Sequence, residues 1–267
     1  MLIPYFSGIA SATELNLVQL SGAKHILIDR IDFKKLRDKG IAWTQKTALD
    51  SGAYKLHHNN VVIDQEMTRH YLIEKYFELA MAQGVSYFDF VVTMDFFGQP
   101  ELTQECWDYM RRRGMHESLP LMPVWVWGSD RASLHTYLDQ ASLVGIGGLV
   151  PPMRARDETV LAELTALCTE FPGRFHLFGL SWLKAINAVK ETGFSFDSST
   201  WLRSAKRFEV FFTDTRTGKL SKAPAVAVGD GELTSGQLAV KSIKAIQEFL
   251  YVPSEASTSE SVTTQSA

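Results

Sequence analysis

The sequence is poor in cysteine and has no long apolar run. Its 267 residues include two cysteines, Cys106 and Cys168, which do not form a C-x-x-C pair. This excludes a disulfide framework and a structural zinc site built from cysteines, and it favours a reducing compartment. No run reaches the ~18 apolar residues of a membrane helix, and the first residues lack the basic segment of a signal peptide. We therefore predict a cytoplasmic protein with no membrane partner.

Strong net charge and metal-binding spacings are also missing. The formal charge is −3, from 27 Lys and Arg against 30 Asp and Glu, which does not suggest a bulk nucleic-acid binder. The seven histidines form neither an H-x-H nor an H-E-x-x-H spacing, so we predict no metal site. The glycine-rich stretch 145–148 lacks the lysine of a phosphate-binding loop, and no cofactor is expected.

Short apolar segments alternate with helix-like segments along the chain. The predicted strands cover 2–9, 24–31, 47–53, 87–95, 119–127, 143–150, 175–181 and 195–198. The predicted helices between them cover 11–20, 64–83, 100–113, 130–140, 157–171 and 182–191. Such alternation is typical of a parallel sheet with helical crossovers. Eight units in about 250 residues favour an α/β fold of the closed (β/α)8 TIM-barrel type, with an open doubly wound sheet as the alternative.

The remaining segments follow the eighth predicted strand. Residues 208–228 are expected to form a hairpin or an extended segment, and 234–250 an apolar-faced helix. The last residues, 253–267, are rich in Ser, Thr and Glu and are predicted to be a disordered tail. We therefore expect one catalytic barrel domain over 1–252.

Three carboxylates fall at the ends of predicted strands, where barrel enzymes place their catalytic groups. They are Asp50, Asp95 and Asp197. Each could instead cap the next helix or turn, but gathering three like charges is costly because each raises the others' pKa. Two carboxylates facing one substrate fit glycosidic-bond chemistry. Tyr54 and Phe178 could sandwich a planar base, although ordinary core packing explains them equally well.

The order of short motifs from 47 to 203 resembles the tRNA-guanine transglycosylase superfamily. The similar stretches are Asp50-Ser51-Gly52-Ala53-Tyr54-Lys55, Met94-Asp95-Phe96-Phe97, Val126-Trp127-Gly128, Gly147-Gly148-Leu149-Val150, Phe178-Gly179-Leu180-Ser181 and Phe196-Asp197-Ser198-Ser199-Thr200-Trp201. The family's zinc motif is missing, because no cysteine follows Cys168. The chain therefore looks closer to the compact, zinc-less branch found in phages and DNA-modification systems.

This resemblance implies a role for each matched residue. Asp197 would be the nucleophile, Asp50 the general acid/base, and Asp95 a hydrogen-bond partner of the guanine edge. The substrate-binding set would comprise Asp95, Tyr54, Ser51, Trp127, Gly148, Leu149, Phe178 and Gly179. The implied reaction exchanges guanine in DNA for a 7-deazaguanine through a covalent intermediate, without zinc. A tRNA transglycosylase that lacks zinc and a non-catalytic barrel that binds nucleic acid are the alternatives.

Basic residues gather just past Asp197. Arg203, Lys206 and Arg207 could contact the phosphate backbone of DNA, or of tRNA in the alternative interpretation. A solvated hairpin surface explains the same charges equally well. The oligomeric state is not predicted by the sequence.

Overall fold

The computed structural model describes residues 1–53, 55, 65–84, 86–96 and 98–251. Two expectations from the sequence, the aromatic contact of Tyr54 and the tail 253–267, lie outside these residues. That 1–252 form a single domain stays a prediction.

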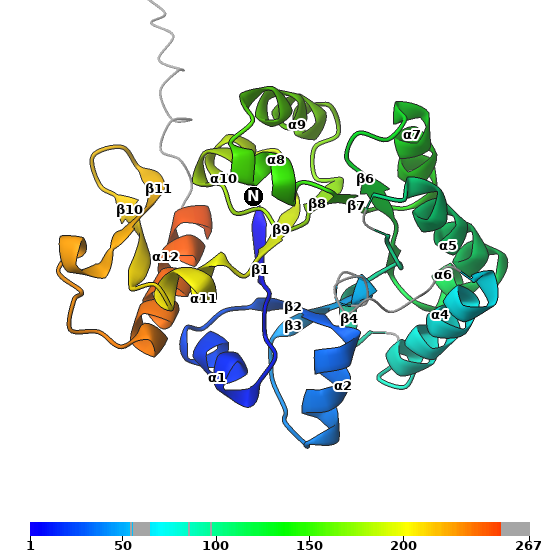
Figure 1. The fold of residues 1–267 in the computed structure, drawn as a ribbon, viewed down its shortest axis with the longest axis horizontal. Coiled ribbons are helices and arrows are strands. Elements are labelled where there is room, and N and C mark those ends of the chain that lie inside the picture. The colour runs from blue at the N-terminus through cyan, green and yellow to red at the C-terminus, as the bar shows by residue number, and fades with distance from the viewer. Residues whose placement is uncertain (54, 56–64, 85, 97, 252–267) are drawn as a thin grey trace, which may run out of the picture.

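The centre of the fold is a parallel barrel (Figure 1). Its strands are β1 (Ile3–Phe6), β2 (His25–Asp29), β3 (Lys46–Asp50), β4 (Phe88–Val92), β5 (Leu121–Met122), β6 (Val124–Val126), β7 (Val144–Gly147), β8 (Phe175–Leu177) and β9 (Ser195–Ser198). They are hydrogen-bonded in the order β5-β4-β3-β2-β1-β9-β8-β7-β6. The (β/α)8 barrel prediction is confirmed: every predicted strand is present, most of them shortened, and the last one covers 195–198 as predicted.

Pro123 divides the fifth barrel strand into β5 and β6. A proline has no N–H to donate to the ladder. β5 pairs with β4, and β6 pairs with β7. The carbonyl of Pro123 still accepts a 2.8 Å bond from the N–H of Gly145. The two short strands therefore act as one barrel strand that joins β4 to β7.

Helices surround the barrel on its outer face (Figure 1). They are α1 (Ala12–Leu20), α2 (Arg30–Asp38), α4 (Glu66–Met81), α5 (Pro100–Arg112), α6 (Met115–Ser118), α7 (Arg131–Gln140), α8 (Val150–Ala155), α9 (Glu158–Glu170), α10 (Leu183–Val189), α11 (Thr200–Ala205) and α12 (Ser235–Tyr251). Side chains of Ser11 and Asp157 cap α1 and α9 by accepting backbone N–H bonds. No helix in the described ranges combines the length and apolarity needed to cross a membrane.

Some helices were not predicted from the sequence. The basic segment around Lys34 forms α2, because Asp29 caps its start and Phe33 and Leu36 are buried one turn apart. The stretch from Thr200 forms α11, with Trp201 fully buried. α2 is largely polar and α11 has only six residues, so neither shows the extended apolar periodicity on which a sequence-based prediction depends.

A hairpin and a long helix lie beside the barrel. β10 (Glu209–Asp214) and β11 (Lys219–Pro224) are antiparallel, followed by a short 3-10 turn over Ala225–Val228. α12 packs against β10, α11 and α1, and it buries Ile243, Ile246 and Leu250. This part, which the sequence predicts, covers the side of the barrel near β1 (Figure 1).

The barrel interior is filled with apolar side chains. The cluster consists of Tyr5, Leu27, Ala48, Phe90, Val92, Met122 and Val124, with Phe178 packed against it. The barrel is stabilised because these apolar side chains are removed from water. The interior is therefore a packed core and not an open channel.

Candidate active site

Asp50 is the last residue of β3 and stands at the carboxyl-terminal mouth of the barrel. Burial raises the pKa of its carboxyl to about 8, and the charges of Asp95, Asp29 and Asp197 add to the increase. A hydrogen bond from the backbone of Gly52 opposes this shift. The structure therefore places the three predicted carboxylates, and a fourth from Asp29, close enough for their charges to interact.

Asp95 follows β4 by three residues. Burial raises the pKa of its carboxyl to about 6, while a hydrogen bond from Ser51 opposes the increase. The hydroxyl of Ser51 lies 3.2 Å from Asp95 Oδ1 and also accepts the N–H of Ala53. Ser51 thus holds the Asp95 carboxylate through one hydrogen bond. Its predicted role in substrate binding stays a prediction.

Tyr76 on α4 fixes the strands that carry these two carboxylates. Its hydroxyl lies 2.9 Å from the carbonyl oxygen of Leu49 and 3.0 Å from that of Val92. Leu49 belongs to β3 and Val92 to β4, so one buried phenol bridges the ends of both strands. Burial raises the pKa of the Tyr76 phenol well above its usual value, and nearby Asp50 contributes to the increase.

Asp197 is held by partners on both sides of β9. Its Oδ2 accepts a 2.7 Å bond from the hydroxyl of Ser7, and its Oδ1 accepts a 2.7 Å bond from the N–H of Gly179. His176 Nε2 lies 3.8 Å from Oδ1, and His176 Nδ1 lies 2.9 Å from the hydroxyl of Ser195. Asp197, His176 and Ser195 are therefore neighbours in the buried wall of the barrel, although 3.8 Å is too long for a hydrogen bond between Asp197 and His176.

Four further residues of this site were not predicted from the sequence. Asp29 ends β2 and caps α2, with bonds from Ile31 and Asp32; it also pairs with Lys55 at 2.6 Å. The other three are Arg30, Ser7 and His176. A signal was present for two of them: Asp29 ends an apolar strand, and His176 is the one polar residue of β8.

Arg30 supplies positive charge beside the carboxylates. Its guanidinium donates to the carbonyl of Leu72 at 3.3 Å. Burial lowers its pKa, while the charges of Tyr76, Asp29 and Asp50 act in the opposite direction. Lys55 forms ion pairs with Asp29 and Asp32. Both cations therefore lie close to Asp29 at the mouth.

Phe178 packs into the barrel instead of standing free at the mouth. Its ring meets the His176 ring edge-on, with centroids 4.8 Å apart. A Cβ on Gly145 would lie 2.5 Å from the Phe178 ring, so the ring needs a glycine beneath it. Ordinary core packing, the alternative weighed from the sequence, accounts for these contacts.

The other predicted binding residues line the edges of β6 to β8. Trp127 is half-buried, and its ring packs edge-on against that of Trp125 with centroids 5.8 Å apart. Its backbone N–H donates to the carbonyl oxygen of Gly147. Leu149 is fully buried. Gly148 and Gly179 have positive φ values of 76° and 64°, where glycine avoids the strain of a side chain. Their roles in substrate binding stay predictions.

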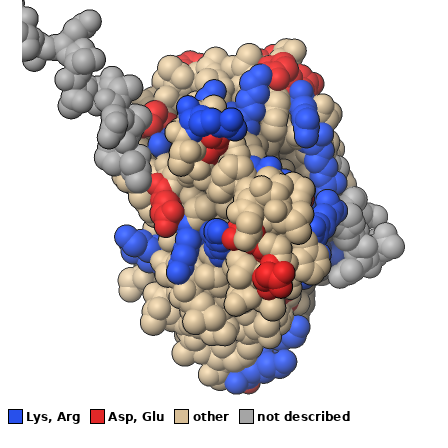
Figure 2. Space-filling view, turned by 90° about the vertical axis from the view of Figure 1, so that its left-hand side faces the viewer, with Lys and Arg blue, Asp and Glu red and all other residues tan. Residues whose placement is uncertain are grey.

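The predicted phosphate contacts lie on or just after α11. Arg203, Lys206 and Arg207 are all exposed, and Lys206 also lies 3.7 Å from Glu14. Figure 2 shows Lys and Arg in separate groups, with Asp and Glu between them. On this face the charges are mixed, and the predicted nucleic-acid contact stays a prediction.

One potential metal-ligand cluster is present among the described residues, and it includes none of these carboxylates. It consists of Glu66 and His70 on α4 and Glu105 on α5. Histidine spacings in the sequence do not indicate this cluster, because its third member lies on another helix.

Comparison with known proteins supports the fold. No family profile and no curated protein matches the chain. Among solved structures, the chain is similar to the tryptophan synthase α-subunit of Pyrococcus furiosus, with TM-score 0.52, 11% identity, and coverage of 92% of this chain and 97% of that chain. A mutant of the same subunit gives TM-score 0.52, 10% identity, and the same coverage. At such identities the likeness concerns the fold alone.

Aldolases are also among the similar structures. A putative fructose-1,6-biphosphate aldolase from Coccidioides immitis has TM-score 0.49 and 8% identity, covering 93% of this chain and 89% of that chain. The transglycosylase expectation is wrong: the similar structures with TM-scores above 0.5 are tryptophan synthase α-subunits and not guanine transglycosylases. The implied glycosyltransferase activity, deazaguanine substrate, DNA modification and phage origin are corrected with it.

The motifs behind that resemblance have a structural explanation. Gly52, Gly128, Gly148 and Gly179 all follow barrel strands with positive φ, between 64° and 90°. Tight turns at strand ends require such glycines. The motif order therefore reflected what a barrel needs at its strand ends.

Proposed function

We propose that the chain is an enzyme that transfers protons at the carboxyl-terminal mouth of its barrel. Asp95 serves as the general base and Asp50 as the general acid. The reaction class is an isomerisation or a lyase-type cleavage of a small hydroxycarbonyl compound, in which one atom loses a proton and another gains one. The named structural neighbours, a tryptophan synthase subunit and aldolases, are enzymes by their names, which is consistent with this class.

The single observation that supports the proposal is the pKa difference between two neighbouring carboxyls. Asp50 has its pKa raised to about 8 and Asp95 to about 6. At neutral pH the first is mostly protonated and the second mostly ionised. Pairs of carboxyls whose pKa values are pushed apart in this way divide acid and base roles.

Asp197 has a different part in the proposal. Its two oxygens accept bonds from Ser7 and Gly179 at 2.7 Å, so its orientation is fixed before substrate binds. A carboxylate fixed in this way can accept a hydrogen bond from a substrate hydroxyl or amine. We assign it substrate orientation, with its neighbour His176 as a positioning residue.

The charges of the mouth support a proposal for the substrate class. Four carboxylates meet there, those of Asp29, Asp50, Asp95 and Asp197. In many barrels the loops after the last two strands bind phosphate, but here the N–H of Gly179 already donates to Asp197. A phosphate would meet a carboxylate in that place. We therefore propose a neutral or cationic substrate without a phosphate group.

Deuterium exchange tests the proposal. A panel of small neutral and cationic hydroxycarbonyl compounds is incubated with the protein in deuterated water, and proton NMR follows the loss of C–H signals next to the carbonyl. We expect exchange with at least one compound. It should fall by about 100-fold or more in Asp95→Asn and Asp50→Asn, since general acid and base catalysis each contribute that much.

The matched control is Asp139→Asn, which changes an exposed aspartate on α7. It should exchange at the wild-type rate. Exchange that persists unchanged in both Asp50→Asn and Asp95→Asn would exclude these carboxyls as the acid and base. The corresponding phosphorylated compounds form a second arm and should show no exchange above background.

A further inference from the structure

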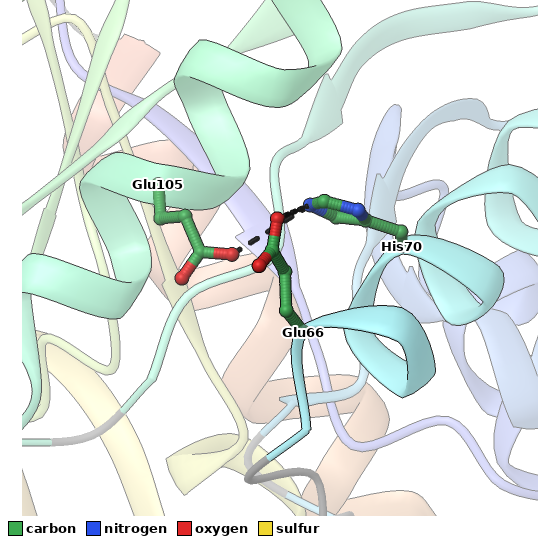
Figure 3. A group of neighbouring side chains, drawn as sticks. All are labelled: Glu66, His70 and Glu105. Atoms are coloured by element: carbon green, nitrogen blue, oxygen red, sulfur yellow. Dashed lines mark ion pairs between the residues drawn. The ribbon is translucent and has the colours of Figure 1, made fainter.

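Two helices outside the barrel bring three metal-binding side chains together. Glu66 and His70 lie one turn apart on α4, and Glu105 projects toward them from α5 (Figure 3). α4 follows β3 and α5 follows β4, so the cluster lies in the seam between neighbouring helices. None of these side chains contributes to the proposed acid–base pair.

The distances suit a metal ion of the zinc class. His70 Nε2 lies 3.7 Å from Glu66 Oε1 and 3.6 Å from Glu105 Oε1, and the three ligand atoms lie within 4.8 Å of one another. Ligands about 2.0–2.1 Å from a tetrahedral ion are about 3.3–3.4 Å apart. Side-chain shifts of a few tenths of an ångström, with a larger one between the two carboxylates, would complete that geometry.

Two of the ligand atoms have no other use among the described residues. His70 Nε2 and Glu105 Oε1 are both buried atoms without a hydrogen bond there. Buried polar atoms normally find a partner, because leaving one unpaired costs free energy. Their separation of 3.6 Å is too long for a direct hydrogen bond. A cation bound between them would satisfy both.

Neighbouring side chains hold the ligands in place. The His70 ring stacks on Tyr109 with centroids 3.8 Å apart and an interplanar angle of 13°, which fixes the direction of Nε2. The guanidinium of Arg69 binds Glu105 Oε2 at 2.6 Å, so the other oxygen, Oε1, faces the histidine. Such outer contacts orient metal ligands in known sites.

We propose that Glu66, His70 and Glu105 form a binding site for a divalent transition-metal ion, with zinc as the preferred ion. One imidazole and two carboxylates are ligands that zinc accepts, and water completes four-coordination. The ion joins the first turn of α4 to α5. Its role is structural, since the ligands are separate from the carboxylates at the barrel mouth.

The test measures metal directly. The full-length protein is stripped with a chelator, dialysed against zinc chloride, and analysed by plasma mass spectrometry. We expect one zinc ion per chain, and cobalt should give the visible absorption bands of a four-coordinate site. Glu66→Gln and His70→Ala should each weaken zinc affinity by at least about tenfold, since loss of even an outer-shell partner has that effect.

The controls separate this site from other histidines and from misfolding. Glu66 is largely exposed, with 69% of its side chain accessible, so Glu66→Gln should fold normally by circular dichroism. His135→Ala changes an exposed histidine on α7 and should keep the bound zinc. If the wild type binds no zinc, or if both ligand variants bind it as tightly as the wild type, the proposal is wrong. In the first case the cluster is only an ionic contact between the helices.

Discussion

The N–H of Gly179 donates a 2.7 Å hydrogen bond to the carboxylate of Asp197. This contact joins the loop after β8 to β9 at the barrel mouth. A Cβ on Gly179 would lie 2.6 Å from a methyl group of Val150, and its φ is 64°. The position of this donor thus requires a glycine, and it fixes one of the two oxygens of Asp197.

The other oxygen of Asp197 gives the first prediction. Ser7→Ala removes the hydroxyl that binds Oδ2 at 2.7 Å. A hydrogen bond to a buried charged group is worth about 1.5–3 kcal/mol, so the free energy of unfolding should fall by that amount. Urea denaturation measures it.

A double-mutant cycle checks the cause. The effect of Ser7→Ala should shrink in an Asp197→Asn background by about 0.5–3 kcal/mol, because the two side chains are in contact. Ser133→Ala, which removes an exposed serine contact on α7, should change stability by less than about 0.5 kcal/mol. Strictly additive effects of Ser7→Ala and Asp197→Asn would show that the contact is not formed in solution.

Asp50 gives a pH-dependent prediction. Its pKa is raised to about 8 in the folded chain, whereas that of an unfolded aspartate is about 3.9. The folded state therefore binds the proton more tightly, and stability is lost as the pH rises through that window. Asp50→Asn lacks this loss, so it should be more stable than the wild type at pH 9 by about 1–3 kcal/mol after allowance for partial exposure.

The comparison that isolates this effect uses two pH values. At pH 5 the wild-type Asp50 is mostly protonated, so the gain of Asp50→Asn should largely vanish. Asp139→Asn should show no such pH dependence. An equal gain of Asp50→Asn at both pH values would show that the pKa of Asp50 is not raised in the folded chain.

The barrel could be predicted from the sequence because its strands are short apolar runs separated by amphipathic helices. Asp50, Asp95 and Asp197 could be placed at strand ends for the same reason, and the structure brings them together. The hairpin after residue 208 could also be predicted from the sequence, with an extended segment as the alternative. Periodicity and strand count are local properties, which a sequence shows directly.

Contacts between residues far apart in the sequence could not be predicted. Ser7 and Asp197 are 190 residues apart, and nothing near either residue indicates the other. The position of Phe178 depends on Gly145, another strand away. The family resemblance failed for a related reason, since glycines with positive φ at strand ends are required by turns whatever the enzyme does.

Charge coupling within the site gives a third prediction. Of the neighbouring charges, that of Asp95 contributes most to the raised pKa of Asp50, after burial. Asp95→Asn removes that charge, so the pKa of Asp50 should fall below about 8. Carbon-13 NMR of labelled aspartate carboxyls measures it. Asp130→Asn, which alters only a helix cap on α7, should leave the titration unchanged; an unshifted Asp50 in Asp95→Asn would show that the two carboxyls do not interact.

The two cysteines give the last prediction, which concerns accessibility. Burial raises the pKa of the Cys106 and Cys168 thiols to about 12 each, and both side chains are fully buried. The thiolate is the reactive form, so neither thiol should react with a disulfide reagent in the native protein at pH 8. Both should react in denaturing urea, and the release of the coloured thiol counts them. Rapid reaction of one thiol without denaturant would show that its helix, α5 or α9, opens locally. Comparing Cys106→Ala with Cys168→Ala would then identify which helix it is.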